Sequence, residues 1–170
     1  MTLDELNRLT QDDAAASLRG CCGCGWWAEQ LAAARPYGDP ATLHDVADAI
    51  FDVMAEAHWQ EAFAAHPKIG ETKSAKMRDA GNRQWSADEQ AGTADADDAA
   101  RDELAALNAE YFERFGYIFI VCATGLSADR MLADLRRRLR HDPRTEAEIA
   151  AAEQRKITHL RLDKLLADGG

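Results

Sequence analysis

The sequence predicts an all-α protein, folded as a single compact helical domain of about seven to nine helices over residues 1–170. Alanine is its most frequent residue and only 4 residues are proline, and alanine loses the least conformational entropy in a helix. Apolar residues recur at spacings of three and four, the period of a helix with one buried face. A length of 170 residues corresponds to one domain and suffices to bury a core.

Five helical segments are expected in the N-terminal part of the chain. The glycines within 20–25 should interrupt the first helices, and Asp39–Pro40 combines an N-cap residue with proline at the first helical position. Apolar residues from Leu43 to Ala57 then follow a 3.6-residue period. The expected helices are 3–9, 12–19, 26–34, 40–57 and 59–65.

Three further helices are expected at 86–115, 127–139 and 145–165. Each begins at a serine or threonine, residue types that cap helix N-termini. Thr145 and Glu148 have the spacing of a capping box. Gly116 lies just past the end of the first of them, where a glycine commonly terminates a helix.

Two segments between the helices have less regular patterns. Residues 68–85 are expected to form an ordered polar loop with at most a short helix at 74–78, and a long polar loop in a compact domain is commonly functional. The apolar run 117–122 has strand propensity but no second strand to pair with. It is either an extended buried segment or the start of a helix.

The formal charge of −10 gives the protein no electrostatic reason to bind nucleic acid or an anionic membrane, which requires clustered lysine and arginine. The one dense basic run, Arg136–Arg138 with Arg140, is interpreted as a solvated helix face. No apolar stretch approaches the roughly 20 residues of a membrane span. The N-terminus lacks a secretory pattern and the C-terminus lacks a Ser-Lys-Leu signal, so the expected location is the cytoplasm.

Cysteine usage indicates a reducing compartment. Three of the 4 cysteines, Cys21, Cys22 and Cys24, lie close together, which raises the question of a metal site. Zinc ligands usually come as a C-x-x-C pair with a distant second pair, and no such partner exists here. These three cysteines are therefore expected to be packed or idle thiols in a turn interrupted by glycines, with no metal bound.

One histidine stands in a suggestive place. His66 ends an expected helix where Pro67 turns the chain into the polar loop, because the residue before a proline is pushed out of helical geometry. A histidine before a proline is either structural or catalytic, and imidazole titrates near neutral pH. The remaining histidines are expected at the surface or at the edge of the core; they are His44, His58, His141 and His159.

Two further positions have both a structural and a functional interpretation. Glu89 follows Ser86 by three residues, so it can complete a capping box, but with Gln90 it also lines a helix N-terminus suited to an anionic or urea-like ligand. Arg161, between two leucines, is either a surface residue with a buried stem or a planar fork directed at a carboxylate.

Several short motifs occur in order along nearly the whole chain. They are 62–70 (AFAAHPKIG), 86–92 (SADEQAG) and 108–123 (NAEYFERFGYIFIVCA), together with Cys21–Gly23, Trp27, Arg35–Tyr37 and Leu160–Leu162. In this combination the chain resembles the 2-oxo-4-hydroxy-4-carboxy-5-ureidoimidazoline (OHCU) decarboxylases. One difference stands out, since Thr124–Gly125 follows Ala123 where many relatives have Arg-Gly. If that arginine assists binding, Lys68 or Arg161 has to compensate.

The resemblance implies an all-α homodimer that converts OHCU, a small ureide, to (S)-allantoin and CO2 in the last step of urate degradation, without cofactor or metal. It implies that His66 and Glu89 are the catalytic pair. The substrate-binding residues that it implies are Pro67, Ser86, Ala87, Asp88, Gln90, Phe119, Ile120, Val121, Cys122, Ala123 and Arg161.

Three alternatives to this function have sequence correlates of their own. A non-enzymatic helical interaction domain would carry a large exposed apolar stripe and would tolerate replacement of His66. A metal hydrolase would need a ligand spacing such as H-E-x-x-H, which is absent. A related lyase acting on another ureido or hydroxy-acid substrate would keep the same motifs.

Overall fold

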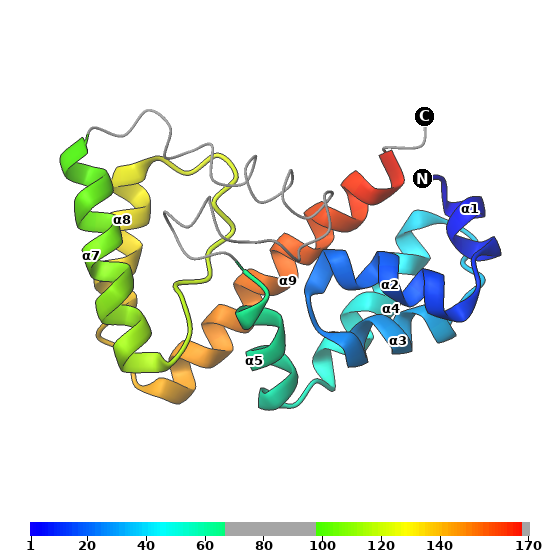
Figure 1. Ribbon diagram of the computed structural model, residues 1–170, viewed down its shortest axis with the longest axis horizontal. Coiled ribbons are helices and arrows are strands. Elements are labelled where there is room, and N and C mark those ends of the chain that lie inside the picture. The colour runs from blue at the N-terminus through cyan, green and yellow to red at the C-terminus, as the bar shows by residue number, and fades with distance from the viewer. Residues whose placement is uncertain (67–97, 168–170) are drawn as a thin grey trace. The chain divides into compact units, whose positions relative to one another are not determined.

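The computed structural model describes residues 1–66 and 98–167, which form eight helices and no strand (Figure 1). The all-α prediction is therefore confirmed. The helices are α1 (Leu3–Arg8), α2 (Gln11–Cys22), α3 (Gly25–Ala33), α4 (Pro40–Asp52), α5 (Glu56–Ala64), α7 (Asp98–Phe115), α8 (Ala128–Arg138) and α9 (Pro143–Ala167). None of the helices in these ranges is long and apolar enough to cross a lipid bilayer.

The chain divides into two compact units. The first runs from Met1 to Ala65 and resumes at Gln154, and the second runs from His66 to Glu153. Helix α9 contributes its first turns to the second unit and its later turns to the first. That both units belong to one domain over 1–170 stays a prediction.

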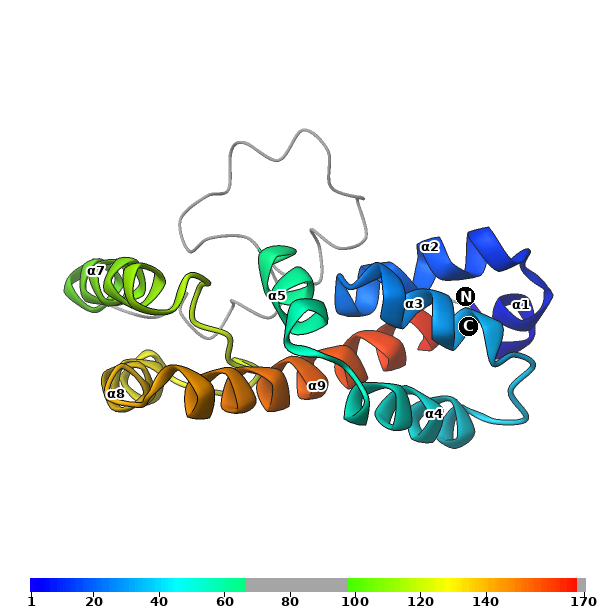
Figure 2. The same ribbon diagram turned by 90° about the horizontal axis from the view of Figure 1, so that it is seen from below.

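In the first unit, α2 and α3 pack side by side, and α3 also packs on α4 (Figure 2). Their shared core consists of fully buried side chains, among them Leu18, Trp27, Leu31 and Leu43. The Trp27 indole N–H donates to the carbonyl oxygen of Ala47 at 3.3 Å, so its polar group is satisfied inside the core.

Two helix boundaries in this unit differ from the sequence-based expectation. The second expected helix, 12–19, does not end before Gly20. Helix α2 instead continues to Cys22 and ends at Gly23, whose φ is +88°. The apolar period from Leu43 onward does not extend one helix to residue 57, since α4 ends at Asp52. Helix α5 starts separately at Glu56, where the ring nitrogen Nδ1 of His58 accepts the Ala55 N–H at 3.2 Å.

Gly23 is required both by its backbone and by its neighbour. A Cβ atom at this position would lie 2.5 Å from Cβ of Ala65, and its φ of +88° disfavours any L side chain. Gly116, which ends α7 as expected, has a similar φ of +82° but nothing within 4 Å of an added Cβ. A comparison of the two glycines therefore separates the effect of backbone strain from the effect of steric crowding by a neighbour.

We expect Gly23→Ala to lower the free energy of unfolding more than Gly116→Ala does. The left-handed backbone costs about 1–2 kcal/mol at either position, and overpacking adds roughly 1–3 kcal/mol at Gly23 alone. Urea denaturation of both variants measures the difference. Equal destabilisation would show that Ala65 yields to the added methyl group.

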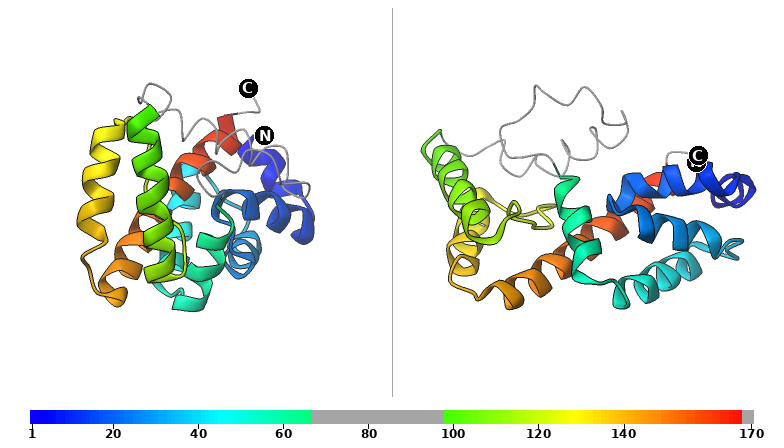
Figure 3. Two further views of the ribbon diagram at one scale, coloured as in Figure 1. Left: turned by 60° about the vertical axis from the view of Figure 1, so that its left-hand side comes forward. Right: turned by 60° about the horizontal axis from the view of Figure 1, so that its bottom comes forward.

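In the second unit, α7 and α8 lie side by side and run in the same direction (Figure 3). Residues 117–127 connect them without helix or strand, so the run 117–122 is not the start of a helix. Ser127 caps α8 as expected, since its hydroxyl accepts the Arg130 N–H at 3.3 Å. The start of α9 differs, because Asp142 accepts the backbone N–H groups of Arg144 and Thr145, and Thr145 is not the cap.

Candidate active site

His66 is reached from the end of α5, and α5 is fixed by the turn between α2 and α3. The Glu61 carboxylate accepts the Gly25 N–H at 3.1 Å, and the His58 ring stacks on Trp26 with centroids 4.4 Å apart. The helix ends at Ala64, and His66 is half-buried beyond it. The prediction that the chain leaves the helix just before His66 is confirmed.

The other half of the expected catalytic pair, Glu89, lies outside the described residues, so its distance from His66 stays a prediction. The same holds for the loop 68–85, the helix start at Ser86 and the expected compensation by Lys68. The substrate-binding residues that also lie outside the described ranges are Pro67, Ser86, Ala87, Asp88 and Gln90.

The remaining substrate-binding segment, Phe119–Ala123, lies in the second unit, and we call it the wall segment. Its Phe119 and Ile120 side chains are buried, while Val121, Cys122 and Ala123 are half-buried. It contains neither helix nor strand, which decides between the two alternatives left open by the sequence. A segment without helix or partner strand must satisfy its backbone groups through side chains or water.

Side chains from three helices hold the backbone of the wall segment. From α7, Asn108 Oδ1 accepts the Phe119 N–H at 3.2 Å. From α8, the Arg138 guanidinium donates from Nη1 to the Ile120 carbonyl at 2.7 Å. From α9, Glu153 Oε2 accepts the Cys122 N–H at 2.8 Å. Side chains of the protein itself thus hold the wall segment in place.

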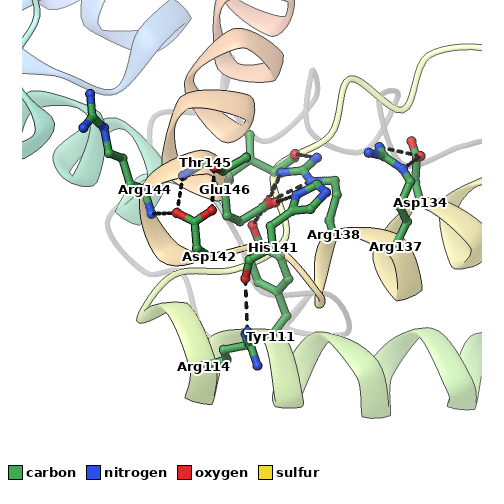
Figure 4. Close-up of polar contacts among 11 residues, drawn as sticks. Tyr111, Arg114, Asp134, Arg137, Arg138, His141, Asp142, Arg144, Thr145 and Glu146 are labelled. Atoms are coloured by element: carbon green, nitrogen blue, oxygen red, sulfur yellow. Dashed lines mark hydrogen bonds and ion pairs between the residues drawn. The ribbon is translucent and has the colours of Figure 1, made fainter.

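Arg138 belongs to a buried ionic network, which corrects its assignment to a solvated face (Figure 4). Its side chain is 1% exposed and its Nε lies 2.7 Å from Oε1 of Glu146, which is itself fully buried. The Tyr111 hydroxyl also donates to Glu146, and the Arg138 guanidinium lies over the Phe119 ring at 4.6 Å from its centroid. Burial of this kind requires paired charges, and the pair is completed inside the protein.

The network is closed toward solvent by His141, whose Nδ1 lies 2.8 Å from Oε2 of Glu146. Burial is the main cause that raises the pKa of Tyr111 above its ordinary value, so its hydroxyl remains a hydrogen-bond donor at neutral pH. The arrangement supports the wall segment through the contact of Arg138 with the Ile120 carbonyl.

Arg161 lies in the first unit, on a polar face of α9. It is 3% exposed, so the interpretation as a surface residue with a buried stem is wrong. Gln154 and Thr158, both fully buried, precede it on the same face, and Gln154 Nε2 donates to the Cys22 carbonyl at 3.3 Å. A buried guanidinium needs anionic or carbonyl partners, which is consistent with the fork directed at a carboxylate.

All four cysteines are free thiols, and three of them are fully buried. Burial raises the pKa of Cys22 from its ordinary 9.0 to about 12, and burial also raises the pKa of Cys24. A thiol held in its neutral form is a poor nucleophile and a poor metal ligand. These two cysteines therefore act as packed apolar residues, in agreement with the expectation from their spacing.

The Cys22 thiol makes stability depend on alkaline pH. In the unfolded chain the thiol loses its proton near pH 9.0, whereas in the folded protein it keeps it until about 12. The unfolded state is therefore favoured as pH rises through this window, by up to about 1.4 kcal/mol per pH unit. We expect urea denaturation between pH 8 and 10.5 to show a steeper loss for the wild type than for Cys22→Ala. Parallel slopes would exclude the assignment.

His44 and His159 lie half-buried in the first unit, as expected, and contact each other with 3.1 Å between their Nδ1 atoms. Each Nε2 faces a carboxylate, at 2.9 Å for Asp163 and 2.8 Å for Asp48. The pair links α4 to α9. Among residues 1–66 and 98–167, no three histidine, cysteine or acidic side chains are arranged to hold a metal ion.

Comparison with known proteins agrees with the family resemblance of the sequence motifs. The family model described as OHCU decarboxylase matches residues 7–163. A crystal structure of an OHCU decarboxylase solved in the presence of (S)-allantoin is similar, with a TM-score of 0.74, 37% sequence identity, and coverage of 88% of this chain and 96% of that one. A crystal structure of an (S)-allantoin synthase shares the fold at a TM-score of 0.71 and 22% identity, over 98% of this chain and 54% of that one.

Two relatives illustrate the range of lengths. The uric acid degradation bifunctional protein TTL of Arabidopsis thaliana is 37% identical over 87% of this chain, which spans 46% of that protein. The chain thus spans less than half the length of the bifunctional relatives. The 2-oxo-4-hydroxy-4-carboxy-5-ureidoimidazoline decarboxylase of Haloferax volcanii is 30% identical, over 95% of this chain and 94% of its own length.

Proposed function

We propose that this chain, which belongs to the OHCU decarboxylase family, converts OHCU to (S)-allantoin and CO2 in urate degradation. The observation that carries the proposal is the family match over residues 7–163, together with the likeness to an OHCU decarboxylase over 88% of the chain. We limit the proposal to this one reaction, because this chain matches only 46% and 33% of the two bifunctional relatives.

The substrate can lose CO2 without a cofactor. Its name places a hydroxyl and a carboxylate on one ring carbon, and when the bond to the carboxylate breaks, the adjoining C=N system accepts the electron pair. No pyridoxal, thiamine or metal sink is then required. The hydroxyl carbon becomes a carbonyl, and a proton is delivered to one face of the neighbouring carbon. The protein supplies positioning, charge stabilisation and that proton.

We assign these tasks to the residues expected from the sequence. His66, paired with Glu89, manages the hydroxyl proton and delivers a proton to the intermediate. Glu89 and Gln90 hold the hydroxyl and ureido groups, and Arg161 holds a carboxylate or carbonyl. The burial of Arg161 supports its assignment, because a buried guanidinium suits a small ligand removed from water. The wall segment, held by Arg138 and Glu153, suits the same kind of ligand.

The direct test generates OHCU in solution from urate with the two upstream enzymes and follows allantoin by circular dichroism. We expect this protein to accelerate the appearance of the (S) enantiomer over the slow uncatalysed reaction, which yields no enantiomeric excess. Activity that survives a chelator excludes the metal hydrolase. A trace that is the same with and without the protein rules out the proposed activity.

We further propose a homodimer in the cytoplasm. The dimer rests on the family resemblance, and the reducing compartment rests on four free thiols, three of them buried. Sedimentation equilibrium at micromolar concentration tests the first of these. A single species at the 18.7 kDa of one chain would contradict it.

A further inference from the structure

We propose that Glu153 is a positioning residue of this enzyme, which holds the wall segment in the geometry that the reaction needs. The inference rests on the proposed function, because it assumes that the substrate contacts the wall segment. It goes beyond that function in assigning a role to a side chain on α9 that carries no family motif in the sequence.

The first step of the argument is that the wall segment depends on side chains for its shape. In a sheet, the neighbouring strand fixes the backbone, whereas here the bonds that fix it come from Asn108, Arg138 and Glu153. Removing one of them releases one point of the segment without unfolding a regular element.

The second step concerns position along the segment. The bonded groups of Ile120 and Cys122 belong to residues two apart, and they are held by Arg138 and Glu153. Val121 lies between these two fixed points. Glu153 and Arg138 together thus restrict the position of Val121.

The third step separates Glu153 from the other two contacts. Asn108 and Arg138 are 6% and 1% exposed, and Arg138 also pairs with the buried Glu146, so both contribute to the core. Glu153 is only half-buried, as is Cys122. A half-buried carboxylate that accepts a backbone N–H at 2.8 Å makes a charge-assisted bond at the open end of the segment.

A small displacement of this end should be costly for the reaction. Groups that are misplaced by about 1 Å can lower a rate by about 10²-fold, because the reacting atoms lose their alignment. Since the product is one enantiomer, a wall segment that moves should also relax the choice of face for protonation. A residue that serves stability alone would change neither the kcat at saturating substrate nor the enantiomeric purity.

The test compares Glu153→Ala with Glu153→Gln in the full chain. The amide oxygen of glutamine still accepts the Cys122 N–H, whereas alanine does not. We expect Glu153→Ala to lose about 10–100-fold in kcat and to release allantoin of lower enantiomeric purity, with Glu153→Gln close to wild type. Glu148→Ala, an exposed position on the same helix that pairs with Arg144, is the matched control and should keep full activity.

The outcomes distinguish this proposal from the proposed function. An active wild type with an equally active and stereoselective Glu153→Ala variant overturns the role of Glu153 alone. An inactive wild type overturns both. If Glu153→Ala does not fold, Glu153→Asp replaces it, since the shorter carboxylate withdraws from Cys122. Full kcat and unchanged stereoselectivity in that variant would likewise overturn the role.

Discussion

Replacing His66 with asparagine is expected to lower kcat for (S)-allantoin formation by about 10²–10⁴-fold, the usual contribution of general acid–base catalysis. Asparagine retains a hydrogen-bonding side chain of similar size but does not exchange protons near neutral pH. His66 is half-buried beyond the end of α5, so the substitution alters no residue of that helix. Coupled circular dichroism, with substrate generated in solution, measures the loss.

The matched control for this prediction is His58→Asn. His58 lies on α5, the helix that precedes His66, is also half-buried, and stacks on Trp26. We expect it to change thermal stability slightly and to leave kcat unaltered. If His66→Asn retained more than about a tenth of the wild-type turnover, below the usual range for a catalytic acid or base, His66 would not be the proton donor.

The second large effect is expected in stability. Glu146→Leu leaves the Arg138 guanidinium buried at 1% exposure without its carboxylate, and loss of one partner from a buried ion pair costs about 3–5 kcal/mol. His141 and Tyr111 lose their acceptor in the same variant. Urea denaturation at pH 7 should show the loss.

The double variant Arg138→Met, Glu146→Leu is the control for this prediction. With both charges replaced by apolar side chains of similar size, the desolvation penalty disappears, and stability should return to within about 1–2 kcal/mol of the wild type. The double variant also removes the contact to the Ile120 carbonyl. Its activity should therefore be lower than that of the wild type even though its stability recovers. Equal stability of the single and double variants would contradict the ion-pair argument.

The helical class could be predicted from the sequence because alanine content, caps and apolar periodicity agree along most of the chain. Helix ends were less predictable near glycines, because a glycine can either continue a helix or end it. Gly20 continues α2, whereas Gly23 ends it with a φ of +88° and lies against Ala65, and neither feature can be seen in the sequence. The run 117–122 was undecided because its backbone partners are side chains distant in sequence.

The buried polar residues could not be predicted from a pattern that treats every charge as exposed. Arg138 follows Met131 and Leu135 at helical spacing, so its position on the buried face of α8 was visible, but its pairing with Glu146 was not. On α9 the buried face combines Glu146, Gln154 and Arg161 with small residues. Because these residues are polar, a search for apolar residues at helical spacing does not identify this part of α9 as buried.

Among the site residues, the sequence alone singled out His66 through the proline that follows it, and the helix end just before it is confirmed. The wall segment and the pairing of His66 with Glu89 came from family resemblance. Glu153 was missed altogether, because a side chain that accepts a backbone N–H leaves no motif in the sequence.

A crystal structure of the protein with (S)-allantoin bound tests the pairing of His66 and Glu89 most directly. We predict the product between an imidazole nitrogen of His66 and the Glu89 carboxylate, each within hydrogen-bond distance, with its ring against Val121 and a carbonyl facing Arg161. Allantoin bound elsewhere, or both side chains directed into bulk water, would contradict the mechanism.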